Sequence, residues 1–140
     1  MAEAAPRGRG VSVILDSNFL FIPGQFGVDI FEELQRLFEG PVRCVVPAPV
    51  TEELRLLRRE AKPKARKMVD FALALTGRCE VAEENLLQGE MVDDAILRLA
   101  QRWGCPVATN DAQLRKRLRA EGIPVIYLRQ RAYLEVDGAI

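Results

Sequence analysis

The stretch VSVILDSNFL, residues 11–20, places an acid at the point where an apolar strand ends. Residues 11–16 predict a strand that is buried on both faces of a sheet. The polar segment Asp16-Ser17-Asn18 follows, and the apolar character then resumes. A carboxylate at this place is either a turn residue or a group displayed at the edge of the sheet. The pattern of the whole chain decides between these interpretations.

Apolar runs and helical patterns alternate along the chain. The expected strands cover residues 11–16, 42–47, 79–83, 105–109 and 124–128. The expected helices cover residues 29–39, 51–60, 63–77, 93–104 and 111–122. Strands that are apolar throughout and separated by helices are typical of a parallel sheet covered on both faces. We therefore expect one α/β domain of about five strands over residues 11–140, preceded by a flexible tail over residues 1–10.

The composition is that of a soluble globular protein. Of the 140 residues, 49% are hydrophobic and 29% are charged. No apolar run approaches the roughly 20 residues that span a bilayer, and the first residues lack the apolar segment of a secretory signal. We expect a cytoplasmic protein with no membrane partner.

Two residue types limit the possible chemistry. The chain has no histidine, which excludes Ser-His-Asp mechanisms and disfavours a zinc site. The cysteines lie far apart in strand-like apolar settings, so we expect reduced core residues at Cys44, Cys79 and Cys105. An enzyme of this composition must use carboxylates, metal ions or backbone groups.

The basic residues are clustered although the net charge is zero. One cluster lies within residues 55–67 and a second within residues 115–131. Each cluster fits either a solvated helix face or the border of a site for a polyanion.

Acidic residues are expected at one edge of the sheet. Asp16 and Asp111 follow predicted strands, and α/β folds bind ligands at the carboxyl ends of their strands. Acid pairs at residues 52–53 and 93–94 lie in the first turns of helices that begin at the same edge. Turn formation or helix capping would explain each acid alone. Together they predict a cluster of carboxylates in one cleft.

Such a cluster favours a bound divalent cation. Neighbouring carboxylates repel one another, and oxygen ligands suit Mg²⁺ or Mn²⁺ better than zinc. A cation held in this way activates water and polarises a phosphodiester. Other α/β acid sites fit less well, because the chain has no GxGxxG or P-loop motif and Asn18 replaces the second Asp of haloacid-dehalogenase-type phosphatases.

Four short motifs resemble those of PIN-domain ribonucleases in order and spacing. They are VILDSNFL (13–20), VTEEL (50–54), VDDAILRLA (92–100) and VATND (107–111). The stretch from residue 92 to residue 138 is similar to an archaeal branch related to small-subunit ribosomal RNA processing nucleases. The resemblance implies a three-layer α/β/α fold with a central parallel sheet and Mg²⁺- or Mn²⁺-dependent endonuclease activity on RNA.

The resemblance also assigns roles to individual residues. The implied catalytic acids, which would also hold the metal ion, are Asp16, Glu53, Asp93 and Asp111, with Asp94 as a further metal ligand. The residues implied to orient these acids or a metal-bound water are Ser17, Asn18, Thr109 and Asn110. The residues expected either to contact RNA phosphates or to form a solvated helix face are Arg115, Lys116 and Arg119.

Three functions are compatible with this resemblance. The favoured one is a processing ribonuclease whose partner is ribosomal RNA or its precursor. The alternatives are a VapC-like toxin ribonuclease with an antitoxin partner, and a non-catalytic PIN scaffold that binds RNA. Because PIN proteins often form dimers, the resemblance also leaves a homodimer open.

Overall fold

One six-stranded sheet forms the centre of the protein. The computed structural model describes residues 10–140, and the rest of the tail expected over residues 1–10 lies outside the described residues. The strands are β1 (Val11–Leu15), β2 (Val42–Pro47), β3 (Glu80–Ala82), β4 (Val107–Ala108), β5 (Val125–Arg129) and β6 (Tyr133–Asp137). Their order in the sheet is β3-β2-β1-β4-β5-β6. The first five strands are parallel, and β6 pairs antiparallel with β5.

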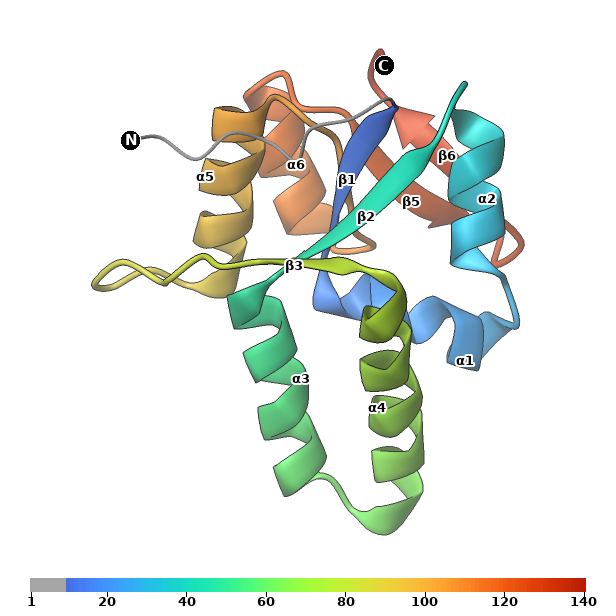
Figure 1. Cartoon of the computed structure of the whole chain (residues 1–140), viewed down its shortest axis with the longest axis vertical. Coiled ribbons are helices and arrows are strands. Elements are labelled where there is room, and N and C mark those ends of the chain that lie inside the picture. Colours follow the sequence, from blue (N-terminus) through green and yellow to red (C-terminus); the bar gives the residue numbers. More distant parts are fainter. Residues whose placement is uncertain (1–9) are drawn as a thin grey trace.

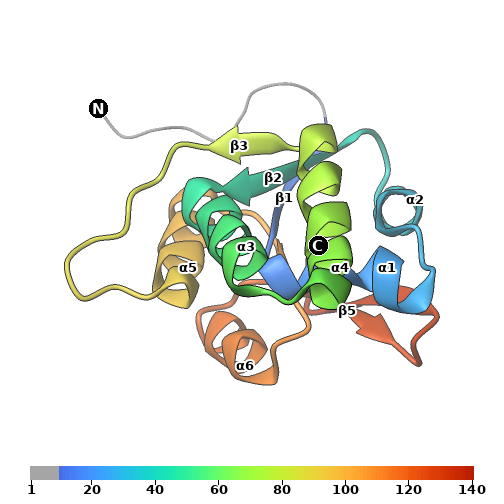
Figure 2. The same ribbon diagram turned by 90° about the horizontal axis from the view of Figure 1, so that it is seen from below.

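Helices cover both faces of this sheet (Figure 1, Figure 2). They are α1 (Ile22–Phe26), α2 (Ile30–Leu37), α3 (Ala48–Glu60), α4 (Pro63–Leu75), α5 (Val92–Trp103) and α6 (Ala112–Ala120), with two 3₁₀ turns, η1 (Ser17–Phe21) and η2 (Thr76–Arg78). In both views α5 and α6 lie on one side of the sheet, whereas α1 and α2 lie on the other. The three-layer α/β/α architecture predicted from the sequence is confirmed.

The central strand β1 is deeply buried. Val13, Ile14 and Leu15 are fully buried, which is why this strand is apolar on both faces. Ile14 lies opposite Val45 of β2 and Val107 of β4 in the parallel register. The apolar faces of the surrounding helices pack against these strands in one hydrophobic cluster of the described residues.

The parallel register brings the ends of β1 and β4 together. Leu15 pairs with Ala108, and the backbone N–H of Asp16 donates to the carbonyl oxygen of Ala108 at 3.0 Å. The residues that follow these two strands, Asp16 and Thr109, are therefore neighbours at the carboxyl edge. Helix α3 begins directly after β2 at the same edge (Figure 1). This is the edge at which the acids are predicted to gather.

Several features differ from the sequence-based prediction, among them the 3₁₀ turn η1 and helix α1, which were not predicted. The sheet has a sixth strand, β6, which was not predicted because the preceding turn lacks the Gly or Asn that marks tight hairpins. Gln130 and Arg131 adopt positive φ angles of 54° and 57° in that turn. Helix α3 begins at Ala48, three residues before the expected start at residue 51, because Pro49 is tolerated in the first turn of a helix.

The cysteines lie in the core or packed against it, as predicted. The cysteines are free, with Cys44 and Cys105 buried and Cys79 half-buried. None of the helices between residues 10 and 140 is both long enough and apolar enough to cross a membrane. The cytoplasmic location stays a prediction.

The packing of β1 gives a test of the core. We expect Ile14→Ala to lower the free energy of unfolding by about 2–5 kcal/mol, because Ile14 is fully buried and the cavity left behind adds to the lost transfer energy. Leu87→Ala is the control, since Leu87 is 58% exposed and its truncation should change stability by less than about 0.5 kcal/mol. Urea denaturation measures the free energy of unfolding of both variants. Equal losses would contradict the burial of Ile14 in the core.

Candidate active site

Asp16 is a buried carboxyl group held by several hydrogen bonds. Its side chain is only 4% exposed. Oδ1 accepts from the backbone N–H of Ser17 at 2.8 Å, and Oδ2 accepts from the hydroxyl of Thr109 at 2.7 Å. The side-chain amide of Asn18 donates to Oδ2 at 3.0 Å. Such partners are required, because a buried carboxyl without hydrogen bonds is costly.

The segment after β4 completes this hydrogen-bond network. The backbone N–H of Asn110 donates to Oδ1 of Asn18 at 2.9 Å, and that of Asp111 donates to the Thr109 hydroxyl oxygen at 3.1 Å. The side-chain oxygen of Asn110 accepts from the N–H of Leu128 in β5 at 2.9 Å. Ser17, Asn18, Thr109 and Asn110 thus all lie in the network around Asp16, although Ser17 acts through its backbone.

The other predicted acids come from three helix starts. Asp111 is the N-cap of α6, and its Oδ1 accepts from the N–H of Leu114 at 2.9 Å. Asp93 lies in the first turn of α5, and Glu53 lies in the second turn of α3. All three side chains are half-buried. Helix capping and display of an acid at the sheet edge therefore occur together in Asp111.

The acids influence one another electrostatically. Burial raises the pKa of Asp16 to about 6, and the charges of Asp93 and Glu53 add to this rise, whereas the hydrogen bonds from Thr109 and Ser17 oppose it. Burial also raises the pKa of Asp93, with contributions from the charges of Asp111 and Glu53. The mutual effects place Asp93 and Glu53 within electrostatic reach of Asp16, and Asp111 within electrostatic reach of Asp93.

The donor set fits Mg²⁺ or Mn²⁺ bound partly through water. All four acids offer oxygen ligands, which suit these hard cations. Among residues 10–140, no three acidic, histidine or cysteine side chains are already gathered as a metal-binding group. Mg²⁺ commonly takes one or two carboxylates and keeps several waters, so it does not require such a group. Its ligation by these acids stays a prediction.

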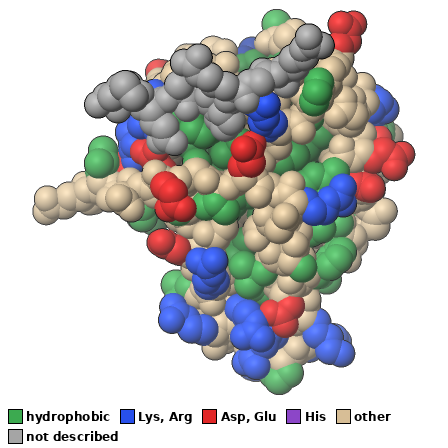
Figure 3. Space-filling view, in the orientation of Figure 1, with side chains coloured by type: hydrophobic (Ala, Val, Ile, Leu, Met, Phe, Trp, Pro, Cys, Tyr) green, Lys and Arg blue, Asp and Glu red, His purple; other side chains and the backbone are tan. Residues whose placement is uncertain are grey.

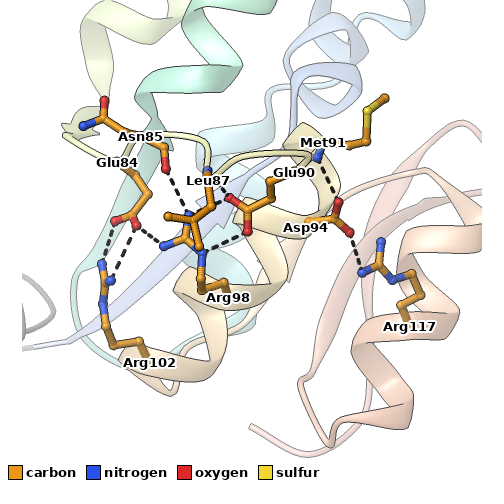
Figure 4. A network of polar contacts seen from close by, with 9 residues as sticks. All are labelled: Glu84, Asn85, Leu87, Glu90, Met91, Asp94, Arg98, Arg102 and Arg117. Carbon is orange, nitrogen blue, oxygen red and sulfur yellow. Dashed lines mark hydrogen bonds and ion pairs between the residues drawn. The ribbon is translucent and has the colours of Figure 1, made fainter.

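The loop before α5 is fastened to that helix by arginines (Figure 4). The guanidinium of Arg98 donates to the carboxylates of Glu84 and Glu90 and, at 3.1 Å, to the carbonyl of Asn85. Arg102 pairs with Glu84 at 2.6 Å. Charge-assisted bonds of this kind are strong, and here they fix the segment that leads into Asp93 at the start of α5.

Asp94 has hydrogen-bond partners on both carboxylate oxygens. Its Oδ2 accepts from the N–H of Met91 at 2.8 Å, and its Oδ1 accepts from Arg117 of α6 at 2.8 Å (Figure 4). Its predicted role as a metal ligand stays a prediction. The contact of Arg117 with Asp94 was not predicted from the sequence, because it joins residues 23 positions apart. The charge of Arg117 also opposes the rise in the pKa of Asp93.

The basic residues of α6 have partners of their own. Arg115 and Arg119 both pair with Asp137 of β6, at 2.9 Å and 3.2 Å. The Arg115 guanidinium also lies 3.8 Å from the ring centroid of Tyr127. Lys116 is exposed. Binding of RNA phosphates by Arg115, Lys116 and Arg119 stays a prediction, and for the two arginines it would compete with Asp137.

Comparison with known proteins identifies similar chains. Residues 13–131 match the family described as PIN like domain. The chain is 31% identical to Ribonuclease VapC4 of Methanocaldococcus jannaschii over 131 residues, which cover 91% of this chain and 98% of that protein. It is also 31% identical to Ribonuclease VapC9 of Archaeoglobus fulgidus over 137 residues, which cover 94% of this chain and 97% of that protein.

Two solved structures share the fold. The PIN domain endonuclease Utp24 aligns with a TM-score of 0.76 and 26% sequence identity, covering 92% of each chain. VapBC-1 from nontypeable Haemophilus influenzae aligns with a TM-score of 0.57 and 16% identity, covering 79% of this chain and 94% of that chain. The second likeness concerns the fold alone.

The burial of Asp16 predicts a pH-dependent stability in metal-free buffer. The unfolded chain ionises Asp16 near its ordinary pKa of 3.8, whereas the folded protein retains the proton to about pH 6. Between these values the folded state binds more protons, so the free energy of unfolding falls as the pH rises. We expect a loss of about 3 kcal/mol from this group.

The Asp16→Asn variant serves as the reference, because it cannot ionise at this position. Urea denaturation in EDTA at several pH values should show that wild type loses this stability between about pH 4 and pH 6 and that the variant does not. Parallel pH profiles for the two proteins would contradict the raised pKa of Asp16.

Proposed function

The chain belongs to the PIN-domain ribonuclease family, and on this premise we propose that it is an Mg²⁺- or Mn²⁺-dependent endoribonuclease that processes ribosomal RNA. The proposal rests chiefly on the buried Asp16 carboxyl, which its hydrogen bonds fix at the edge it shares with Glu53, Asp93 and Asp111. The processing role is supported by the sequence resemblance to the processing branch, and the endonuclease activity by the likeness to the PIN domain endonuclease Utp24.

The residues of the chain would prepare the reaction by position and charge. A bound cation would supply an activated water and would stabilise the charge that develops on the phosphate. Thr109 and Asn18 hold Oδ2 of Asp16, so this carboxylate does not have to reorganise when the substrate binds. Glu53, Asp93 and Asp111 complete the negative site. The repulsion among these carboxylates favours the binding of a cation.

A VapC-like toxin ribonuclease is the second candidate. It is supported by the 31% identity to the two ribonucleases VapC4 and VapC9 over nearly their whole lengths. An antitoxin-like gene directly upstream would favour this role, and its absence would favour processing. A homodimer is compatible with either role.

Metal-dependent cleavage of RNA is the first test. We expect the wild type to cut structured or single-stranded RNA in the presence of Mn²⁺, and Asp16→Asn to reduce the rate by about 100-fold or more because it removes a charged ligand. Glu39→Gln is the matched control, since Glu39 is exposed and outside the site. Equal rates for wild type and Asp16→Asn would point to a contaminating nuclease.

Thermal stability in the presence of cation is the second test. Binding at a cation concentration of 100 times Kd stabilises the folded state by about 2.7 kcal/mol, so Mg²⁺ or Mn²⁺ should raise the Tm of the wild type. Asp93→Asn and Asp111→Asn should reduce this rise, whereas Glu39→Gln should retain it. If all the variants respond to the cation as the wild type does, these acids do not form the site.

A further inference from the structure

The hairpin formed by α3 and α4 carries a concentrated positive charge. Residues 55–67 contain seven Lys or Arg residues and one acid, a net charge of +6 in a chain whose net charge is zero. The rest of the chain therefore has a net charge of −6. Figure 3 shows Lys and Arg side chains gathered at the lower end of the molecule, over this hairpin.

Two of these seven residues have structural roles. Arg58 of α3 pairs with Asp70 of α4 and so joins the two helices. Arg66 donates to the carbonyl of Ala61 at 3.1 Å and so braces the turn between the helices. These contacts hold the hairpin together and leave the other basic residues available.

The other five basic residues form an exposed surface, which we call the basic arm. Its members are Arg55, Arg59, Lys62, Lys64 and Lys67. Among the described residues none of the five has an ion-pair partner. The arginines of α5 and α6 contrast with them, since Arg98, Arg102, Arg115, Arg117 and Arg119 are all paired with acids.

The arm lies at the same end of the molecule as the acidic site but on another side of α3. Helix α3 starts at the carboxyl edge of the sheet and runs away from it (Figure 1). With 3.6 residues per turn, Arg55 and Arg59 lie on the side of the helix roughly opposite Glu53. The part of an RNA strand bound to the arm would therefore lie beside the site and would leave the site free for another part of the same strand.

We propose that the basic arm binds backbone phosphates of the RNA substrate outside the cleavage site, an inference that rests on the proposed ribonuclease function. The acidic site repels a polyanion, and the rest of the chain has a net negative charge, so RNA needs a positive surface to approach. Contacts from Lys and Arg to phosphates supply affinity and position the strand without reading its sequence.

Salt-dependent binding tests this role apart from cleavage. The full chain carrying Asp16→Asn is titrated with a fluorescently labelled oligouridylate at several salt concentrations. Adding Arg55→Gln, Arg59→Gln and Lys62→Gln should weaken binding and reduce the slope of log K against log salt by about 2, because three phosphate contacts to a single strand are lost. The charge-conserving pair Arg55→Lys and Arg59→Lys should retain the original slope, and the Tm should be unchanged in both variants.

Cleavage kinetics with Asp16 intact provide a second measurement. The triple Gln variant should raise KM for long RNA while kcat is retained, and it should cut a dinucleotide at the rate of the wild type, because a dinucleotide is too short to reach the arm. If the slope and KM are unchanged, the basic arm does not bind RNA, and its charge would instead suit an acidic protein partner. RNA cleavage that depends on Asp16 would still stand in that case. If the wild type neither binds nor cleaves RNA, both proposals are overturned.

Discussion

The burial of the Asp16 carboxyl is the constraint on which the sheet edge depends. A carboxyl that is only 4% exposed needs hydrogen-bond donors, and they come from Ser17, Asn18 and Thr109. Because Thr109 follows β4, these bonds also lock the ends of β1 and β4 together. The same hydroxyl accepts from the N–H of Asp111, so the start of α6 is fixed by the group that satisfies Asp16. One local requirement thus positions two of the four acids.

Asp16 and Asp111 each use one carboxylate oxygen to cap the element that follows them. Oδ1 of Asp111 caps α6. Oδ1 of Asp16 likewise caps the 3₁₀ turn η1 through the N–H of Ser17. Capping and cation binding, which the sequence left as alternatives for each acid, are compatible because each oxygen of an ionised carboxylate has more than one lone pair. Burial chiefly, and the charges of the neighbouring acids in addition, raise the pKa of Asp16 and Asp93, and a divalent cation would relieve the repulsion among the acids.

The sequence was sufficient where the signal is local or follows from sheet topology. The apolar runs of β1 and β2 predict buried strands, and parallel topology then places Asp16 beside the segment after β4. The sequence was insufficient where a contact joins distant segments and no motif or periodicity marks that contact. Arg117 and Asp94 meet only because α5 and α6 pack side by side. Strand β6 was missed because its turn holds two non-glycine residues at positive φ, which no turn signature marks.

Net charge was the least informative quantity of the sequence, because it averages over surfaces that act separately. The far end of α3 lies about 10 Å along the helix axis from Glu53, and Lys62 and Lys64 of the basic arm lie at the turn that follows it. The Debye length at physiological ionic strength is about 8 Å, so exposed charges at that separation are largely screened from one another. The lysines can therefore attract phosphates with little loss to the acids, and the acids can hold a cation with little repulsion from the lysines. A chain of zero net charge can in this way serve a metal ion and a polyanion at the same end of one fold.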